Sequence, residues 1–181
     1  MKKYLITDPS FYTSDPQIFS IKLLHVIDNT SPDFICIRDK ISDNYQDIVL
    51  EIKKQIDHPK IILHTDYKLA HKLDFYGVHL PSSDAKNIEK AKKMGLCVVV
   101  STHTLEEAKN AEKSGADFIT FSPIYFTPNK GKPKGLEKLK EINGKIDIDC
   151  FALGGIVEDE QIQACKHAGV YGFASIRYFI K

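Results

Sequence analysis

The stretch Cys97–Phe121, CVVVSTHTLEEAKNAEKSGADFITF, holds a complete strand–helix–strand unit. It opens with the apolar run Cys97–Ser101 and closes with a second, Asp117–Phe121. Both are apolar nearly throughout, as parallel strands that are covered on both faces are. Between them, Thr104-Leu105-Glu106-Glu107 has the residues of a capping box, and Gly115 stands where that helix should end. The unit predicts a parallel sheet with helices packed on its faces.

Runs of the same kind recur along the whole chain. We expect strands at Lys3–Thr7, Phe34–Arg38, Lys60–His64, Gly77–Leu80, Cys97–Ser101, Asp117–Phe121, Asp149–Leu153 and Val170–Ile176. A helix-sized segment separates each pair, so eight units predict one α/β domain over residues 1–181, a closed (β/α)8 TIM barrel. Such barrels typically take about 250 residues. This one must be minimal, and the few residues after Arg177 leave its eighth helix largely missing.

Composition narrows the classes of partner. The formal net charge is +1, so no chain-wide basic field favours nucleic acid. No run approaches the roughly 20 apolar residues that span a bilayer. The four cysteines are scattered, and three lie in apolar runs, as reduced core thiols do. We expect a cytoplasmic protein without disulfides or structural zinc, whose partner is a small phosphorylated molecule and neither nucleic acid nor membrane.

Two loops after neighbouring strands predict a phosphate site. Ser122–Gly135 combines prolines, glycines, hydroxyls and three lysines, although an ordinary solvated basic loop has a similar composition. Phe151–Ile156 ends in paired glycines and precedes the acidic helix start Val157–Glu160. Paired glycines let backbone N–H groups approach an anion beside the positive end of a helix dipole. Together the two loops favour an anionic ligand.

Polar side chains follow every predicted strand, at the ends where TIM barrels carry their chemistry. They are Thr7, Asp8, Arg38, Asp39, Lys40, His64, Thr65, Asp66, His79, Asp84, Ser101, His103, Lys130, Ser175 and Arg177, and the seventh strand ends in the paired glycines Gly154 and Gly155, whose backbone is polar. Cationic and imidazole groups outnumber carboxylates at this mouth, which again indicates an anion site. We expect Asp8 and Asp39 to be structural.

The same motifs resemble the thiamine-phosphate synthase and thiazole tautomerase family. They are Leu5–Asp8, Ile37–Lys40, Gly77–Leu80 with Asp84, Ser101–Glu107, Pro123–Lys130 and Gly154–Ile156, in family order over nearly the whole chain. The resemblance implies a transferase of thiamine biosynthesis that couples hydroxymethylpyrimidine diphosphate to thiazole phosphate. In that family, Mg²⁺ holds the leaving diphosphate.

The resemblance also implies roles for individual residues. Arg38 and Lys40 would hold the diphosphate, with Asp84 as a metal ligand. His79 and Ser101 would line the pyrimidine side. Thr127, Lys130, Gly154 and Gly155 would bind phosphate and diphosphate oxygens.

Several positions depart from the family pattern. Family synthases carry Asn-Asp after the third strand, where this chain has His64 and Thr65; the adjacent Asp66 is a candidate replacement for the second metal ligand. A pyrimidine-recognising Gln is replaced by Cys36, a phosphate-binding Ser by Arg177, which can still hold phosphate, and a Thr or Ser by Asn129. With one securely placed carboxylate, we expect Mg²⁺ to bind only together with diphosphate.

Two alternatives to the synthase stay open. A thiazole-phosphate tautomerase, an isomerase, needs only proton transfer, but the histidine typical of that branch is Pro123 here. His64, His79 and His103 would then be the acid/base candidates, because histidine titrates near neutral pH. The third reading is a non-catalytic barrel that binds thiamine phosphate or thiazole phosphate.

The missing eighth helix also predicts assembly. Its absence would uncover apolar surface between the first and seventh helices, and such patches usually find a partner. We expect a homodimer with Tyr178, Phe179 and Ile180 at or near the contact. The competing possibility is that this tail folds back across the gap within one chain.

Overall fold

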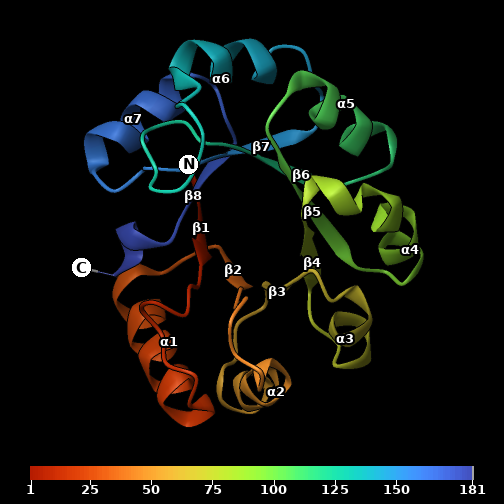
Figure 1. Ribbon diagram of the computed structural model, residues 1–181, viewed down its shortest axis with the longest axis vertical. Helices are drawn as coiled ribbons and strands as arrows, with labels where there is room; N and C mark the ends of the chain where they lie inside the picture. The colour runs from red at the N-terminus through yellow and green to blue at the C-terminus, as the bar shows by residue number, and fades with distance from the viewer. Residues whose placement is uncertain (181) are drawn as a thin grey trace.

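The computed structural model describes residues 1–180, whose strands form a closed parallel barrel in chain order (Figure 1). The strands are β1 Lys2–Ile6, β2 Phe34–Ile37, β3 Ile61–His64, β4 Gly77–Leu80, β5 Cys97–Thr102, β6 Phe118–Phe121, β7 Asp149–Leu153 and β8 Gly172–Ser175. The barrel closes where β1 pairs with β8, with Tyr4 opposite Ala174. The predicted TIM barrel is confirmed.

Helices surround the barrel as an outer ring (Figure 1). They are α1 Pro16–Thr30, α2 Tyr45–Gln55, α3 Tyr67–Lys72, α4 Ile88–Lys93, α5 Leu105–Lys113, α6 Gly135–Asn143 and α7 Asp159–His167, with 3₁₀ helices η1 Ser82–Asn87 and η2 Arg177–Phe179. The capping box of α5 is formed as predicted by Thr104 and Glu107. No described helix has both the length and the apolar character needed to cross a membrane.

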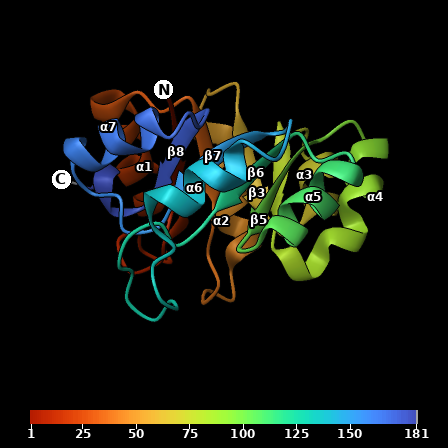
Figure 2. The same cartoon turned by 90° about the horizontal axis from the view of Figure 1, so that it is seen from above.

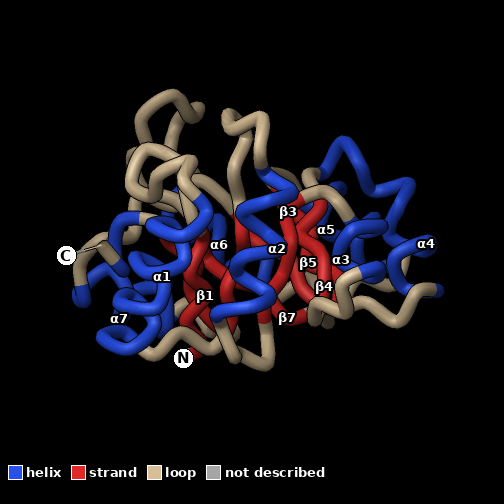
Figure 3. Tube along the Cα trace, turned by 90° about the horizontal axis from the view of Figure 1, so that it is seen from below, coloured by secondary structure: helices blue, strands red, loops and turns tan. Residues whose placement is uncertain are grey.

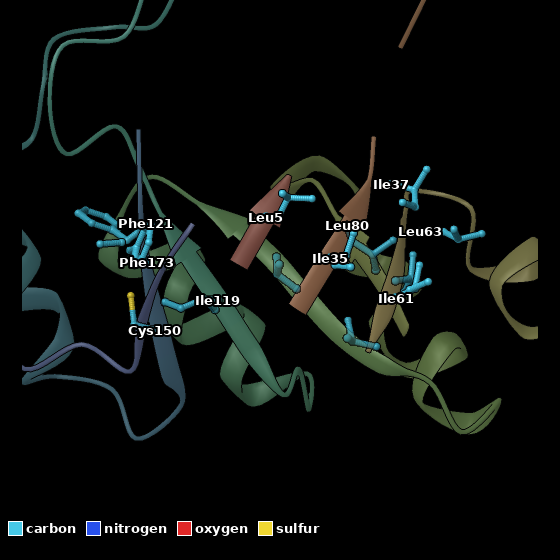
Figure 4. Close-up of a cluster of buried hydrophobic side chains, with 14 of the residues drawn as sticks. Leu5, Ile35, Ile37, Ile61, Leu63, Leu80, Ile119, Phe121, Cys150 and Phe173 are labelled. Carbon is cyan, nitrogen blue, oxygen red and sulfur yellow. The ribbon is translucent and has the colours of Figure 1, made fainter. Parts of the chain in front are cut away.

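The core has two layers, because successive strand side chains point to opposite faces of the sheet. Outward-pointing side chains such as Leu5, Ile35 and Phe121 pack beneath the helices (Figure 4). Inward-pointing residues fill the barrel, among them Tyr4, Phe34, Cys36, Ile62 and Phe151. Aromatic rings dominate this interior, and Tyr4 contacts both Phe34 and Phe151. The barrel interior is therefore a packed core and not a pore.

Long loops gather at one end of the barrel, away from the N-terminus (Figure 3). The β6–α6 loop extends well beyond the strands and is the teal loop of Figure 2. All strands are parallel, so their carboxyl ends and the loops that follow share this end.

The chain after β8 forms no α-helix within the described residues. Instead, the chain that follows β8 forms η2, which lies between α1 and α7 (Figure 1), and Phe179 of η2 is 3% exposed. As expected, no eighth α-helix follows β8 within residues 1–180. A groove of about 930 Å³ remains between α1 and this segment, lined in part by Tyr12, Ile21 and Ile180. The tail thus covers part of the gap within its own chain.

Candidate active site at the barrel mouth

A cavity of about 500 Å³ opens at the carboxyl ends of the strands. All but three of the predicted site residues line it: Arg38, Lys40, His64, His79, Ser101, His103, Thr127, Lys130, Gly154, Gly155 and Arg177. The parallel barrel brings these residues together from β2 through β8, although they are spread over most of the sequence. Their roles stay predictions, since position alone assigns no chemistry.

Thr7 and Asp8 hold Arg38 at the mouth. The Thr7 hydroxyl accepts a hydrogen bond from the Arg38 backbone N–H at 2.8 Å and donates to the Arg38 carbonyl at 3.0 Å. The Arg38 guanidinium pairs with the Asp8 carboxylate at 2.6 Å. Burial raises the pKa of Asp8, but hydrogen bonds from Ser10 and Arg38 outweigh it and lower the pKa overall. The structural role expected for Asp8 is confirmed.

The cations of the mouth lie close enough to repel one another. The pKa of Lys40 is lowered first by burial and then by the charges of Arg38 and Lys130. Asp8 is the single carboxylate among the described residues that line the cavity, and it is already paired with Arg38. The mouth therefore carries uncompensated positive charge, which a bound anion would neutralise.

The paired glycines pack directly against the β6–α6 loop. Both have positive φ, +100° at Gly154 and +70° at Gly155. A Cβ on Gly154 would come within 2.8 Å of the Pro123 Cα, and one on Gly155 within 2.5 Å of the Phe126 carbonyl oxygen. The Gly154 carbonyl also accepts a hydrogen bond from the Tyr125 N–H at 2.9 Å. Glycine is needed here to join the two loops that were predicted to bind phosphate.

Backbone donors remain available beside these loops. The N–H groups of Gly154, Gly155 and Ile156 make none of the loop hydrogen bonds found in the described chain. The α7 N-terminus, in contrast, is already capped: Glu158 and Gln161 form a reciprocal capping box there. The assistance of this helix dipole to an anion at the glycines stays a prediction, because a capping box leaves the macrodipole in place. The three residues that carry these N–H groups all line the cavity.

Two histidines of the mouth are held neutral. Burial, then the charges of Lys40 and Arg38, lower the pKa of His64 to about 4. Burial likewise lowers the pKa of His79 to about 3, with further contributions from His64 and the two cations. His79 is 3% exposed and bonds Ser101 through Nε2 at 3.0 Å. His79 is therefore a buried, hydrogen-bonded histidine that also lines the cavity.

His103 has a defined orientation. Its Nδ1 lies 3.0 Å from the Ser122 carbonyl oxygen and 3.3 Å from the Ser122 hydroxyl. The carbonyl can only accept, so the shorter contact favours a proton on Nδ1. In the neutral ring Nε2 is then a free acceptor at a residue that lines the cavity. The N-cap of α5 is its neighbour Thr104, as predicted.

Three predicted site residues do not line the cavity. Asp66 is the N-cap of α3 and accepts from the Leu69 N–H at 2.9 Å. The Asp84 carboxylate accepts from the Asn87 side-chain amide at 2.6 Å. Asn129 is exposed at the tip of the β6–α6 loop with φ of 59°. No group of three or more His, Cys, Asp or Glu side chains that could hold a metal occurs among residues 1–180.

Sequence reasoning missed some cavity residues. Ser82, on η1, and Ser122 line the mouth, as does the aromatic ring of Phe11 from the β1–α1 loop. Ser122 is the first residue of the predicted phosphate-binding loop Ser122–Gly135. In the sequence, Phe11 and Ser82 carry no signal that separates them from ordinary loop residues.

Comparisons with known proteins agree with this architecture. A family model described as thiamine monophosphate synthase matches residues 3–179. A solved structure of thiamine phosphate pyrophosphorylase from Pyrococcus furiosus superposes with a TM-score of 0.76 at 26% identity, covering 97% of this chain and 85% of that one.

Curated relatives are similar over part of their length. The thiamine-phosphate synthase of Bacillus licheniformis is 36% identical over 68% of this chain, and that of Halalkalibacterium halodurans is 37% identical over 68%. The matched regions span 56% and 63% of those proteins. With the family model covering nearly every residue of the barrel, the chain belongs to the thiamine monophosphate synthase family.

Proposed function

We propose that the protein couples hydroxymethylpyrimidine diphosphate to thiazole phosphate and releases diphosphate, as a thiamine-phosphate synthase. One observation carries the proposal. Arg38, Lys40 and Lys130 line a cavity in which Asp8, the single lining carboxylate among the described residues, is already paired with Arg38. The mouth therefore carries excess positive charge that favours anionic ligands. Family membership supplies the candidate substrates, both of which carry phosphate.

The chemistry suits these residue types. In the coupling, the bond between the pyrimidine methylene carbon and the diphosphate oxygen breaks, and a bond from that carbon to the thiazole nitrogen forms. Negative charge develops on the departing diphosphate, and fixed cations stabilise such charge more than a proton-transfer base would. Arg38, held by Asp8, and Lys40 would stabilise the diphosphate. Thr127 and Lys130, on the β6–α6 loop, would contact both ligands.

The second phosphate would bind at the joined β6–α6 and β7–α7 loops. The N–H groups of Gly154 and Gly155 supply neutral donors there, and Arg177 lines the same cavity from the last strand end. Adjacent loops at the end of the barrel sequence are the common phosphate-binding corner of TIM barrels.

A divalent metal has little preformed support. Asp66 and Asp84 are both engaged in local hydrogen bonds and neither lines the cavity, so the described residues do not fit a closed metal site. Mg²⁺ commonly binds through one or two carboxylates together with substrate phosphates. We therefore keep Mg²⁺ as a ligand that requires bound diphosphate.

A thiazole-phosphate tautomerase is the second candidate, and the geometry of His103 favours it. Its Nε2 is a free acceptor beside the phosphate loops and could take a proton from a bound thiazole. This reaction would use the same phosphate corner and leave the diphosphate cations without a role.

One assay separates these candidates. Purified protein is incubated with both substrates and Mg²⁺, and thiamine phosphate is measured by chromatography; the thiazole phosphate isomers are followed in a parallel reaction without the pyrimidine. The synthase proposal expects thiamine phosphate, and its loss in Arg38→Gln. Isomerisation alone, abolished by His103→Asn, would replace it with the tautomerase, and binding without either reaction would indicate a non-catalytic barrel.

A further inference from the structure

A chain of side chains runs from the barrel interior to the cavity wall. The hydroxyl of Tyr4, on β1, lies 3.0 Å from Nδ1 of His79, on β4. His79 Nε2 lies 3.0 Å from the Ser101 hydroxyl oxygen, on β5. Tyr4 is fully buried, while Ser101 is partly exposed and lines the cavity. The chain thus links a core residue to a group that a ligand would touch.

The neutral state of His79 limits the directions of these bonds. In a neutral imidazole one nitrogen donates and the other accepts. Either Tyr4 donates to Nδ1 and Nε2–H donates to Ser101, or Ser101 donates to Nε2 and Nδ1–H donates to Tyr4. The first arrangement leaves the Ser101 proton for a ligand in the cavity, whereas the second leaves only the lone pairs of the Ser101 oxygen.

The surroundings of Tyr4 favour the first arrangement. In the second, the Tyr4 proton would need another acceptor, and the group within its reach is the Cys36 thiol. Sulfur is a weak acceptor, whereas an imidazole nitrogen is a strong one. In the first arrangement the Cys36 S–H can donate to the Tyr4 oxygen, so each of these buried polar groups has a partner.

We infer that Tyr4 is a positioning residue that holds His79 as the Nε2–H tautomer and so makes Ser101 a hydrogen-bond donor to the ligand. The Ser101 oxygen accepts from His79, and its own proton is left to point into the cavity. No other hydrogen bond of the Ser101 hydroxyl occurs within residues 1–180. The ligand atom opposite Ser101 is then an acceptor, such as a ring nitrogen or a phosphate oxygen. The identity of that ligand rests on the proposed function; the tautomer does not.

The tautomer can be measured without a ligand. Nitrogen-15 NMR of labelled protein at pH 7 distinguishes protonated from unprotonated imidazole nitrogens, and the His79→Gln variant identifies the His79 signals. We expect an unprotonated Nδ1 and a protonated Nε2. Tyr4→Phe keeps the ring and should populate both tautomers of His79. Tyr171→Phe removes a hydroxyl from another ring that packs against the barrel interior and should leave the His79 tautomer unchanged. A protonated Nδ1 in the wild-type protein, or an unchanged tautomer in Tyr4→Phe, overturns the inference.

A double-mutant cycle tests the link to Ser101. With hydroxymethylpyrimidine diphosphate as the calorimetric probe, Tyr4→Phe should weaken binding about three- to tenfold, the range of one hydrogen bond. In the Ser101→Ala background the same substitution should cost little more, because Tyr4 acts through Ser101. Fully additive losses contradict that link. Absence of binding by the wild-type protein, with the tautomer as expected, would count against the proposed substrate and leave the tautomer assignment supported.

Discussion

Phe179 stacks on Phe173, with ring centroids 5.8 Å apart and ring planes within 4° of parallel. Phe173 belongs to β8 and Phe179 to the 3₁₀ turn that follows it, so the tail folds back onto the strand it has just left. Tyr178 meets both rings edge-on and donates to the Asp159 carboxylate at 2.9 Å. This small aromatic cluster takes part of the space that a full eighth helix would cover.

Loss of the Phe179 ring should destabilise the barrel. Phe179→Ala removes a side chain that is 3% exposed, and we expect the free energy of unfolding to fall by about 3 kcal/mol or more. Urea unfolding followed by circular dichroism measures this. Phe126→Ala, at a phenylalanine that is 75% exposed, is the matched control and should change stability by less than about 0.5 kcal/mol. Equal effects of the two substitutions would show that the tail does not contribute to the core.

The homodimer stays a prediction, now centred on α1. Phe179 is engaged within its own chain, but Ile18 and Ile21 on α1 are 49% and 66% exposed, and Ile21 lines the groove beside the tail. We expect a dimer in sedimentation at about 10 µM, and a monomer for Ile21→Lys, since a charge would be buried in the contact. Met94→Lys, at the C-cap of the distant α4, should stay dimeric. A wild-type monomer at this concentration excludes the proposal.

Gly154→Ala should disrupt the joined loops. The added Cβ would meet Pro123 at 2.8 Å and force a residue with a side chain to keep φ near +100°. We expect a loss of about 2 kcal/mol or more in unfolding free energy. The same substitution at Gly131, in the β6–α6 loop, meets no atom within 4 Å and should be tolerated. Thermal melts of the two variants compare them directly, and similar melting temperatures would argue against the tight approach.

Acid should weaken the fold through the buried histidines. His64 and His79 have folded-state pKa values lowered to about 4 and about 3, whereas an unfolded histidine titrates near 6.5. Between these values the unfolded chain binds more protons, so stability falls as pH drops from about 6.5 to 4, by up to about 1.4 kcal/mol per pH unit for each histidine. Urea unfolding at several pH values should show this slope.

A shallower slope is expected for His64→Gln, which removes one of the two groups. His71→Gln, at an exposed histidine on α3, serves as the control and should keep the wild-type slope. Stability that is constant from pH 6.5 to 4.5 would mean that neither histidine is held neutral in the folded protein.

Much of the fold was predictable because its signals are local. The bounds of β4 and β7 agree with the apolar runs Gly77–Leu80 and Asp149–Leu153. The last strand is shorter than the sequence predicts: the apolar run is Val170–Ile176, whereas β8 spans Gly172–Ser175. Burial extends beyond the paired residues there, so hydrophobicity alone overestimates the strand.

The site was predictable where topology alone decides it. Parallel strands bring their carboxyl ends together, so the convergence of Arg38 and Lys130 follows from the fold. The sequence could not predict that Asp66 caps a helix and does not face the cavity, because aspartate both caps helices and binds metals. The bond between Tyr4 and His79 joins β1 to β4 across the barrel interior, and only the three-dimensional packing reveals it.

The central claim is that the cations of the mouth bind a phosphorylated ligand, and calorimetric titration with thiazole phosphate tests it most directly. We expect saturable binding that weakens as salt rises, because charge pairs at an open mouth are screened. Lys130→Ala should lower the affinity about tenfold, the range of one hydrogen bond to a charged group. Lys132→Ala, in the same loop but outside the cavity lining, should not. Absent binding, or equal affinity of the wild-type protein and Lys130→Ala, would contradict the account.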